Sequence, residues 1–188
     1  MVDQIRCRRR KAPTVGVGKA AELPSPGTGW PVCIRFADPR DREQVQAYFC
    51  SLSAQARYNR FLGGMSKLPE SVIEHFVRRA CTDQFTMLAT TMHDGSEIVV
   101  GEARYVLDQD RSRAELALSV HDRWQGRGIG RSLVKQLERH AMASGVRRIF
   151  VEMLESNARI CRYARAFGYA PASSVDWRLV CFEKTLAV

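Results

Sequence analysis

Hydrophobic residues recur with two different periods along this chain, and the periods separate predicted strands from predicted helices. In residues 114–120 apolar side chains alternate with small or polar ones, so that Leu116 and Glu115 fall on opposite faces of a predicted strand. Beyond the glycine-rich turn that follows, apolar residues recur every three or four positions, which predicts an amphipathic helix that Gly145 ends. The inner side of this helix is expected to carry Ile129, Leu133, Val134, Leu137 and Ala141.

The same patterns predict the remaining elements and the fold class. Residues 85–92 and 98–107 are rich in β-forming side chains, and the turn sequence Asp94-Gly95 between them predicts an antiparallel hairpin. Asp38 is placed to cap a helix whose first turn contains Pro39. Strands are expected at 32–36, 85–92, 98–107, 114–120, 147–154 and about 175–185, and helices at about 38–49, 53–61, 68–80, 129–144 and 157–167. We therefore expect an α+β fold with helices flanking a mixed, mostly antiparallel sheet.

Charge is unevenly distributed, because more than half of the net charge of +9 belongs to the first twenty residues. That segment holds six arginine or lysine residues against Asp3 alone, and it lacks any hydrophobic period. We expect residues 1–30 to form a solvated, disordered basic tail and residues 31–188 to form the folded domain. Contact of the tail with nucleic acid or an acidic partner, or a targeting role, remains open as an alternative.

The spacing of cysteine and histidine indicates neither a metal site nor a disulfide framework. The six cysteines contain no C-x-x-C pair and the four histidines show no ligand spacing, so the thiols are expected to be reduced. No apolar run reaches the roughly 20 residues that cross a bilayer, and the N-terminus lacks the continuous apolar segment of a signal peptide. We therefore expect a cytoplasmic protein without a metal or a membrane partner.

A glycine-rich turn, Gln125-Gly-Arg-Gly-Ile-Gly130, follows the predicted strand at 114–120. Such a turn directs unpaired backbone N–H groups at a phosphorylated ligand, and glycine lets the backbone approach the anion closely. Two known phosphate motifs do not fit. Arg131 stands where the third glycine of a dinucleotide fingerprint belongs, and Gly130-Arg131-Ser132 lacks the Gly-Lys-Ser/Thr of a Walker loop.

The pattern that remains is Q/R-x-x-G-x-G/A, followed by Glu155-Ser156-Asn157 and Phe167-Gly168-Tyr169. With these motifs, residues 32–185 resemble the GNAT superfamily of N-acetyltransferases. The resemblance implies that family's acyl-CoA N-acyltransferase fold, with acetyl-CoA as co-substrate. It also implies that backbone N–H groups of the turn hold the coenzyme A pyrophosphate and that the preceding strand end bonds the pantetheine arm. We expect the Arg127 and Arg131 side chains to contact the pyrophosphate, because they sit in the first turn. The implied cofactor-binding residues are Leu118, Ser119, Val120, Gln125, Gly126, Arg127, Gly128, Ile129, Gly130, Arg131, Ser132 and Asn157.

Acetyl transfer to an amine needs a general base, because deprotonating a lysine of pKa about 10.4 at pH 7 costs about 4.6 kcal/mol. Glu115 is our candidate, since it lies on the polar face of the strand that leads to the turn, where the resemblance implies a glutamate. A purely structural role for Glu115 is the alternative, and Glu102 is the rival base. Many family members carry a tyrosine general acid where this chain has Ala164, and the neighbouring Tyr163 points about 100° away and is expected to pack.

Residues 52–61 and 114–117 are similar to segments of bacterial protein-lysine acetyltransferases. This resemblance implies a lysine on a protein as the acceptor, with acyl-CoA synthetases the usual target of that group. Arg57, Tyr58 and Arg60 either shape an acceptor groove or stabilise a helix pair. A small-molecule amine acetyltransferase and a non-catalytic acyl-CoA-binding sensor remain as alternatives.

Overall fold

A seven-stranded sheet organises the part of the chain that the computed structural model describes, which is residues 30–62, 67–78, 83–174 and 176–186. The strands are β1 (Cys33–Phe36), β2 (Gln84–His93), β3 (Ser96–Leu107), β4 (Arg113–Val120), β5 (Arg148–Leu154), β6 (Ala170–Ala172) and β7 (Leu179–Thr185). They lie in the order β1-β2-β3-β4-β5-β7-β6. Five neighbouring pairs are antiparallel and only β4 and β5 are parallel, so the predicted mixed sheet is confirmed.

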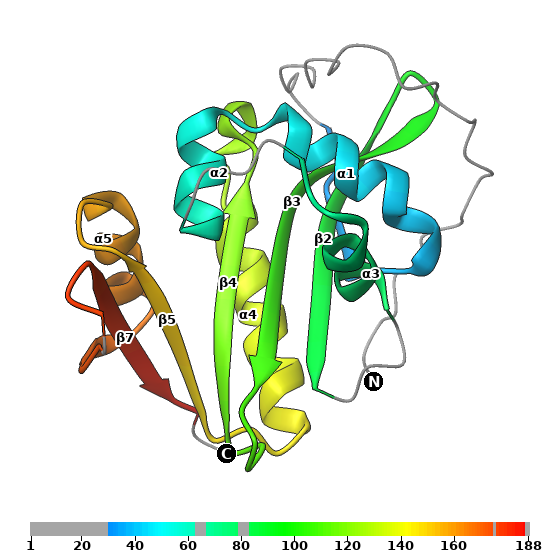
Figure 1. Cartoon of the computed structure of the whole chain (residues 1–188). Coiled ribbons are helices and arrows are strands. Elements are labelled where there is room, and N and C mark those ends of the chain that lie inside the picture. The colour runs from blue at the N-terminus through cyan, green and yellow to red at the C-terminus, as the bar shows by residue number, and fades with distance from the viewer. Residues whose placement is uncertain (1–29, 63–66, 79–82, 175, 187–188) are drawn as a thin grey trace.

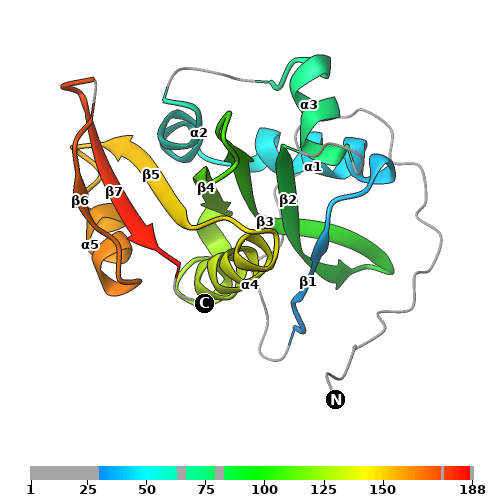
Figure 2. The same cartoon turned by 90° about the horizontal axis from the view of Figure 1, so that it is seen from below.

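Helices cover both faces of the sheet (Figure 1). They are α1 (Arg42–Ser51), α2 (Ala54–Phe61), α3 (Glu70–Val77), α4 (Ile129–Ala143) and α5 (Ala158–Ala166). Seen from below, α1, α2 and α3 lie over one face, and α4 and α5 lie over the other (Figure 2). Two clusters of buried apolar side chains fill the spaces between these layers, a larger one under α4 and a smaller one under α1 and α3.

The buried face of α4 is the one that the sequence predicts. Its buried residues are Ile129, Leu133, Val134, Leu137 and Ala141. The helix also approaches the sheet closely at Gly101 of β3, where an added Cβ would lie 3.3 Å from the Ser119 carbonyl oxygen and 3.4 Å from Leu133 Cδ1. This packing fixes the first turn of α4 beside the end of β4.

Local turn chemistry also follows the sequence in most places. Asp94 and Gly95 both adopt positive φ, 46° and 76°, in the hairpin between β2 and β3. Asp38 accepts a hydrogen bond from the Arg40 amide as a helix cap, but the helix that it begins is divided. A 3-10 turn at Pro39–Asp41 comes first, because Asp41 closes a capping box back onto Asp38, and α1 starts only at Arg42.

The C-terminal strand is the main error of the sequence-based prediction. It begins at Leu179 rather than near residue 175, because Asp176 forms a local turn that accepts hydrogen bonds from the Arg178 side chain and from the Arg178 and Leu179 amides. The short edge strand β6 was not predicted, since its three residues include Pro171, which weakens any strand pattern.

Several predictions fall outside the described residues. They are the disordered tail at 1–29 and the glycine break at 63–64. The helix predicted to reach residue 80 ends earlier, at Val77, because Arg78 has an extended backbone. Among the described residues, no helix combines the length and apolar composition that crossing a bilayer requires.

The sheet opens between β4 and β5. These strands pair only at Arg113 with Arg148, Ala114 with Ile149 and Glu115 with Phe150. Beyond that point β4 continues to Val120 on the β3 side, and β5 continues to Leu154 on the β7 side, so the two strands diverge. The divergence leaves two facing strand edges whose backbone groups do not pair with each other.

Candidate functional site

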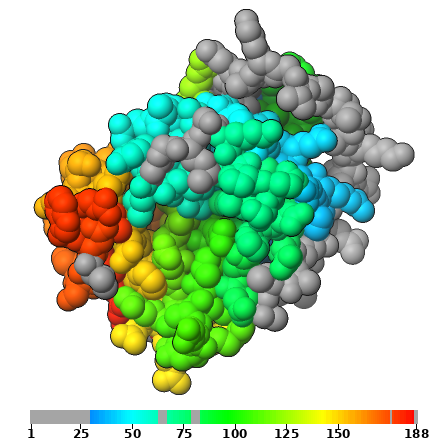
Figure 3. Space-filling model, in the orientation of Figure 1, coloured from blue at the N-terminus to red at the C-terminus, as the bar shows by residue number. Residues whose placement is uncertain are grey.

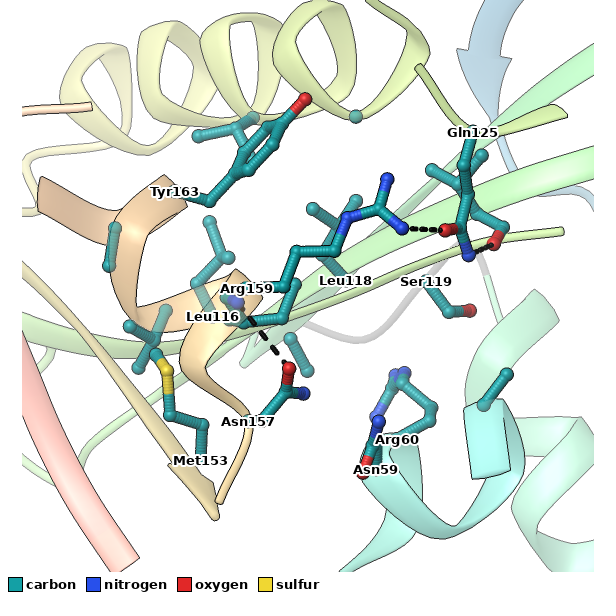
Figure 4. A pocket seen from close by; sticks show the side chains of 18 of the residues that line it. Asn59, Arg60, Leu116, Leu118, Ser119, Gln125, Met153, Asn157, Arg159 and Tyr163 are labelled. Atoms are coloured by element: carbon teal, nitrogen blue, oxygen red, sulfur yellow. Dashed lines mark hydrogen bonds between the residues drawn. The ribbon is translucent and has the colours of Figure 1, made fainter. Parts of the chain in front are cut away.

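A cavity of about 390 Å³ occupies the opening between β4 and β5 (Figure 4). Its walls come from α2, β4, the β4–α4 turn, the start of α4, β5 and α5. Among the sequence-predicted residues, those that line it are Glu115, Leu118, Ser119, Val120, Gln125, Gly126, Gly128, Ile129, Gly130 and Asn157. The structure therefore brings the candidate base and most of the candidate cofactor-binding residues into one cavity.

The glycine turn has the geometry of an anion-binding loop. Gly126 and Gly128 have φ of 76° and 78°, a left-handed conformation that side chains disfavour, and open space lies where a Cβ of either would stand. Gly128 caps α4, and its carbonyl accepts the first helical hydrogen bond from Ser132. The amides of residues 129–131 come before Ser132 in the chain, so they have no acceptor within the helix. They are therefore available to a negatively charged group.

Gln125 connects this turn to both walls of the cavity. Its Nε2 donates to the Val120 carbonyl oxygen at 3.0 Å, and its Oε1 accepts a hydrogen bond from Arg159 Nη1 at 2.6 Å. Arg159 belongs to the first turn of α5, and its side chain crosses the cavity to reach Gln125 (Figure 4). Arg159 was not predicted from the sequence, because 34 residues separate it from Gln125 and no local pattern relates the two.

Three of the predicted cofactor-binding residues do not line this cavity. Arg127 and Ser132 border a separate hollow beside Trp30 and Trp124, and the Arg131 guanidinium lies 5.9 Å from the centre of the Phe167 ring. Arg127 lies in the turn before α4, whereas Arg131 and Ser132 lie in its first turn, where successive side chains point about 100° apart. Contact of these side chains with phosphate stays a prediction.

Asn157 and Tyr163 belong to the α5 side of the cavity. Asn157 caps α5, and its Oδ1 accepts a hydrogen bond from the Ile160 amide at 3.4 Å. Tyr163 packs against Phe167 with ring centres 5.6 Å apart, as expected, but it also lines the cavity, which was not expected. Ala164 is buried beside it, so the structure offers no acidic side chain at that position.

Glu115 presents an unpaired carboxylate to the cavity. No hydrogen bond or ion pair holds it among the described residues, although it lies on the last paired position of β4 and β5. Partial burial raises the pKa of Glu115, and the nearby Glu152 carboxylate raises it further. Arg60 and Arg104 oppose this shift of the Glu115 pKa, so the carboxylate lies between like and opposite charges.

Glu102 is held in a buried network and does not line the cavity. Only 1% of Glu102 is exposed, and its carboxylate accepts hydrogen bonds from Arg60 Nε at 2.6 Å and from Ser119 Oγ at 2.7 Å. Because the Ser119 hydrogen goes to Glu102, the Tyr48 hydroxyl is the donor in its 2.9 Å contact with Ser119. We call these four residues the Arg60–Glu102 network.

The Arg60–Glu102 network joins four elements, since Tyr48 lies on α1, Arg60 on α2, Glu102 on β3 and Ser119 on β4. It therefore gives Arg60 a structural role in holding α2 against the sheet. It also makes Glu102 a poor candidate for the base, because its oxygens are occupied by fixed donors.

Comparison with known proteins places these features in one family. Residues 46–169 match the model of the acetyltransferase (GNAT) family. An acetyltransferase of Pseudomonas aeruginosa is 26% identical to the chain over 145 residues, which are 77% of this chain and 78% of that protein.

Solved structures share the fold. The GNAT domain of Streptomyces lividans PAT superposes with a TM-score of 0.74 at 23% identity, covering 81% of this chain and 89% of that domain. The Salmonella typhimurium protein yncA, whose structure contains its cofactor acetyl-CoA, gives a TM-score of 0.67 at 19% identity, covering 84% of this chain and 95% of that one. At these identities the likeness concerns the fold alone.

The burial of the Arg60–Glu102 pair leads to a stability prediction. Replacing one partner leaves the other charge buried and unpaired, so Glu102→Leu should lower the free energy of unfolding by about 3–5 kcal/mol. The double variant Arg60→Met, Glu102→Leu should recover much of this loss, because no uncompensated charge remains. Equilibrium urea unfolding measures both, with Glu74→Gln on the exposed Arg42–Glu74 pair as a control near wild type. Equal losses in the single and double variants would contradict the assigned role of the charge.

Proposed function

Because the chain belongs to the GNAT family of acetyltransferases, we propose that it acetylates a lysine side chain on a cytoplasmic protein, with Glu115 as general base. Family membership makes it an acetyl-CoA-dependent acetyltransferase. The observation that carries the finer proposal is that Glu115 offers a free carboxylate in the same cavity as the glycine turn.

The residues around the cavity fit acetyl-CoA. The left-handed glycines of the turn leave open space beside unpaired helix amides, which suits the coenzyme's diphosphate. The diverging edges of β4 and β5 offer backbone donors and acceptors to the amides of the pantetheine arm. The amide hydrogens of Asn157 project from the α5 side, since its oxygen is used in capping.

Acetyl-CoA supplies the acetyl group, and Glu115 acts as the general base. Glu115 takes a proton from the acceptor ammonium, which frees the nitrogen lone pair to form the amide bond as the thioester C–S bond breaks. A carboxylate with a raised pKa accepts this proton more readily than an ordinary glutamate. The tetrahedral intermediate then carries a second N–H proton that must leave the nitrogen. Since position 164 is alanine, a water molecule relays this proton to the departing sulfur, so that the products are the amide and the free thiol of coenzyme A.

The open side of the cavity supports a protein as the acceptor. In the space-filling view, the surface of α2 (cyan) and that of the C-terminal hairpin (red) border the uncovered part of the sheet (Figure 3). Exposed aromatic side chains belong to these two segments, Tyr58 of α2 at 45% exposure and Trp177 before β7 at 88%. Exposed apolar side chains around a catalytic opening favour contact with a folded partner.

The role of Glu115 is tested by Glu115→Gln. The substitution removes the base but keeps the shape of the side chain, so kcat should fall about 10²–10⁴-fold while the acetyl-CoA dissociation constant stays unchanged. Thiol release measures kcat, and titration calorimetry measures binding. Raising the pH should restore part of the rate, because more of the amine is then unprotonated. Glu43→Gln on the exposed side of α1 is the matched control.

Two results would count against this role of Glu115. Equal loss of rate and binding in Glu115→Gln would make the residue structural. Wild-type binding of acetyl-CoA with no transfer to any amine, before or after the substitution, would favour the acyl-CoA-binding sensor.

A pH profile tests the electrostatics around Glu115. A general base must be unprotonated, so log kcat/KM should rise with pH through the pKa of Glu115. Glu152→Gln removes a like charge that raises the Glu115 pKa, while Arg60 and Arg104 still lower it, so the acidic limb of the profile should move to lower pH. Glu155→Gln, outside the cavity lining, should leave the limb in place. An unmoved limb in Glu152→Gln would show that Glu152 does not act on the base.

The acceptor class is tested by comparing a protein acceptor with small amines. The protein is incubated with acetyl-CoA and an acyl-CoA synthetase, and acetyl-lysine is located by mass spectrometry. In parallel, thiol release is measured with a panel of small amines. The proposal expects a modified lysine on the synthetase and slower release with every small amine. Faster turnover of a small amine, with the synthetase unmodified, would favour the small-molecule alternative.

A further inference from the structure

Arg159 occupies an unusual position for a basic residue. Asn157 caps α5, so Arg159 is the second residue of the helix, where the positive end of the helix dipole disfavours a cation. The side chain is exposed and leaves its own helix to cross the cavity (Figure 4). Its partner there is the neutral Gln125 oxygen, at 2.6 Å, so no carboxylate accounts for the charge at this point. Stability of α5 therefore does not explain the position of this guanidinium.

Arg159 is also the cation best placed to meet an anion in the cavity. Arg60 is the other arginine that lines it, but its guanidinium is committed to Glu102. The arginines within the glycine-turn segment, Arg127 and Arg131, do not line the cavity. Within the described part of the chain, Arg159 thus supplies the available positive side chain on the cavity side of the turn.

We propose that Arg159 binds the diphosphate of acetyl-CoA, exchanging the Gln125 oxygen for a phosphate oxygen as the coenzyme enters. This inference rests on the proposed function. Gln125 opens the turn whose free amides face the same space, so a guanidinium bonded to Gln125 already lies beside the place of an anion. A hydrogen bond between two ionic groups is stronger than one to a neutral amide, which favours the exchange. Gln125 keeps its other bond, to the Val120 carbonyl, and so need not leave the strand end.

The proposal assigns two states to one side chain. In one state, Arg159 joins α5 to the turn across the cavity through its hydrogen bond to Gln125. With coenzyme, the same side chain joins α5 to the ligand. The cavity wall therefore keeps a connection between its two sides in both states, and the guanidinium never has to lie unpaired.

Titration calorimetry separates a phosphate contact from a change in cavity shape. Wild type, Arg159→Gln and Arg162→Gln are titrated with acetyl-CoA, 3′-dephospho-acetyl-CoA and acetyl-pantetheine. Arg162 is an exposed arginine of the same helix that does not line the cavity, which makes it the matched control. Arg159→Gln should raise the dissociation constant about tenfold for both diphosphate-containing ligands and leave that for acetyl-pantetheine unchanged. Arg162→Gln should behave as wild type throughout.

Each other result overturns the assignment. Equal weakening with acetyl-pantetheine would mean that Arg159 shapes the cavity without touching phosphate. Weakening with acetyl-CoA but not with the 3′-dephospho form would assign the contact to the 3′-phosphate. Tighter binding by Arg159→Gln would mean that the Arg159–Gln125 bond only obstructs the ligand. If binding heats of acetyl-pantetheine are small, kcat/KM with this donor gives the same comparison.

Failure of wild type to bind acetyl-CoA would instead contradict the proposed function itself.

Discussion

The site depends on the point at which β4 and β5 stop pairing. A parallel pair that continued past Glu115 and Phe150 would close the sheet and satisfy the facing backbone groups. Instead, β4 continues to pair with β3, and β5 continues to pair with β7. The buried face of α4 packs against one face of the sheet. The opening has a free carboxylate where pairing ends and a glycine turn beyond the far end of β4. Backbone geometry thereby brings the candidate base and the candidate phosphate-binding turn into one cavity.

Two glutamates near this opening have different surroundings, and these surroundings are the basis of the different roles that we propose for them. Glu102 is buried and has fixed donors on its oxygens, so it joins helices α1 and α2 to the sheet. Glu115 has no partner, and its pKa is raised by partial burial and by Glu152. A buried, fully bonded carboxylate contributes to architecture, whereas an unpaired one in a cavity is available for proton transfer.

Much of the fold could be predicted from sequence because it rests on local periodicity. The inner face of α4, the β2–β3 hairpin and the cap at Asp38 follow from interactions between residues close in sequence, and the structure bears them out. The predicted start of β7 was wrong, because hydrogen bonds to the Asp176 side chain stabilise a local turn that competes with strand pairing.

The parts of the site that the sequence could not give are long-range. The Arg60–Glu102 bond joins residues 42 positions apart, and nothing in either segment specifies the pairing. Arg127 and Arg131 were predicted as phosphate contacts because they are close in sequence to the turn. Arg159, which lines the cavity, belongs to a different helix, α5. A motif locates the backbone of a binding loop well, but it does not determine which side chains surround the loop in space.

Hydrogen exchange with and without acetyl-CoA tests the central claim most directly, because it reports on the backbone groups that the diverging strands and the turn leave available. Saturating acetyl-CoA should slow amide exchange in residues 116–120, 126–131 and 151–154, and leave β2 unchanged. Protection confined to other segments, or none at saturation, would contradict the assignment of this cavity as the acetyl-CoA site.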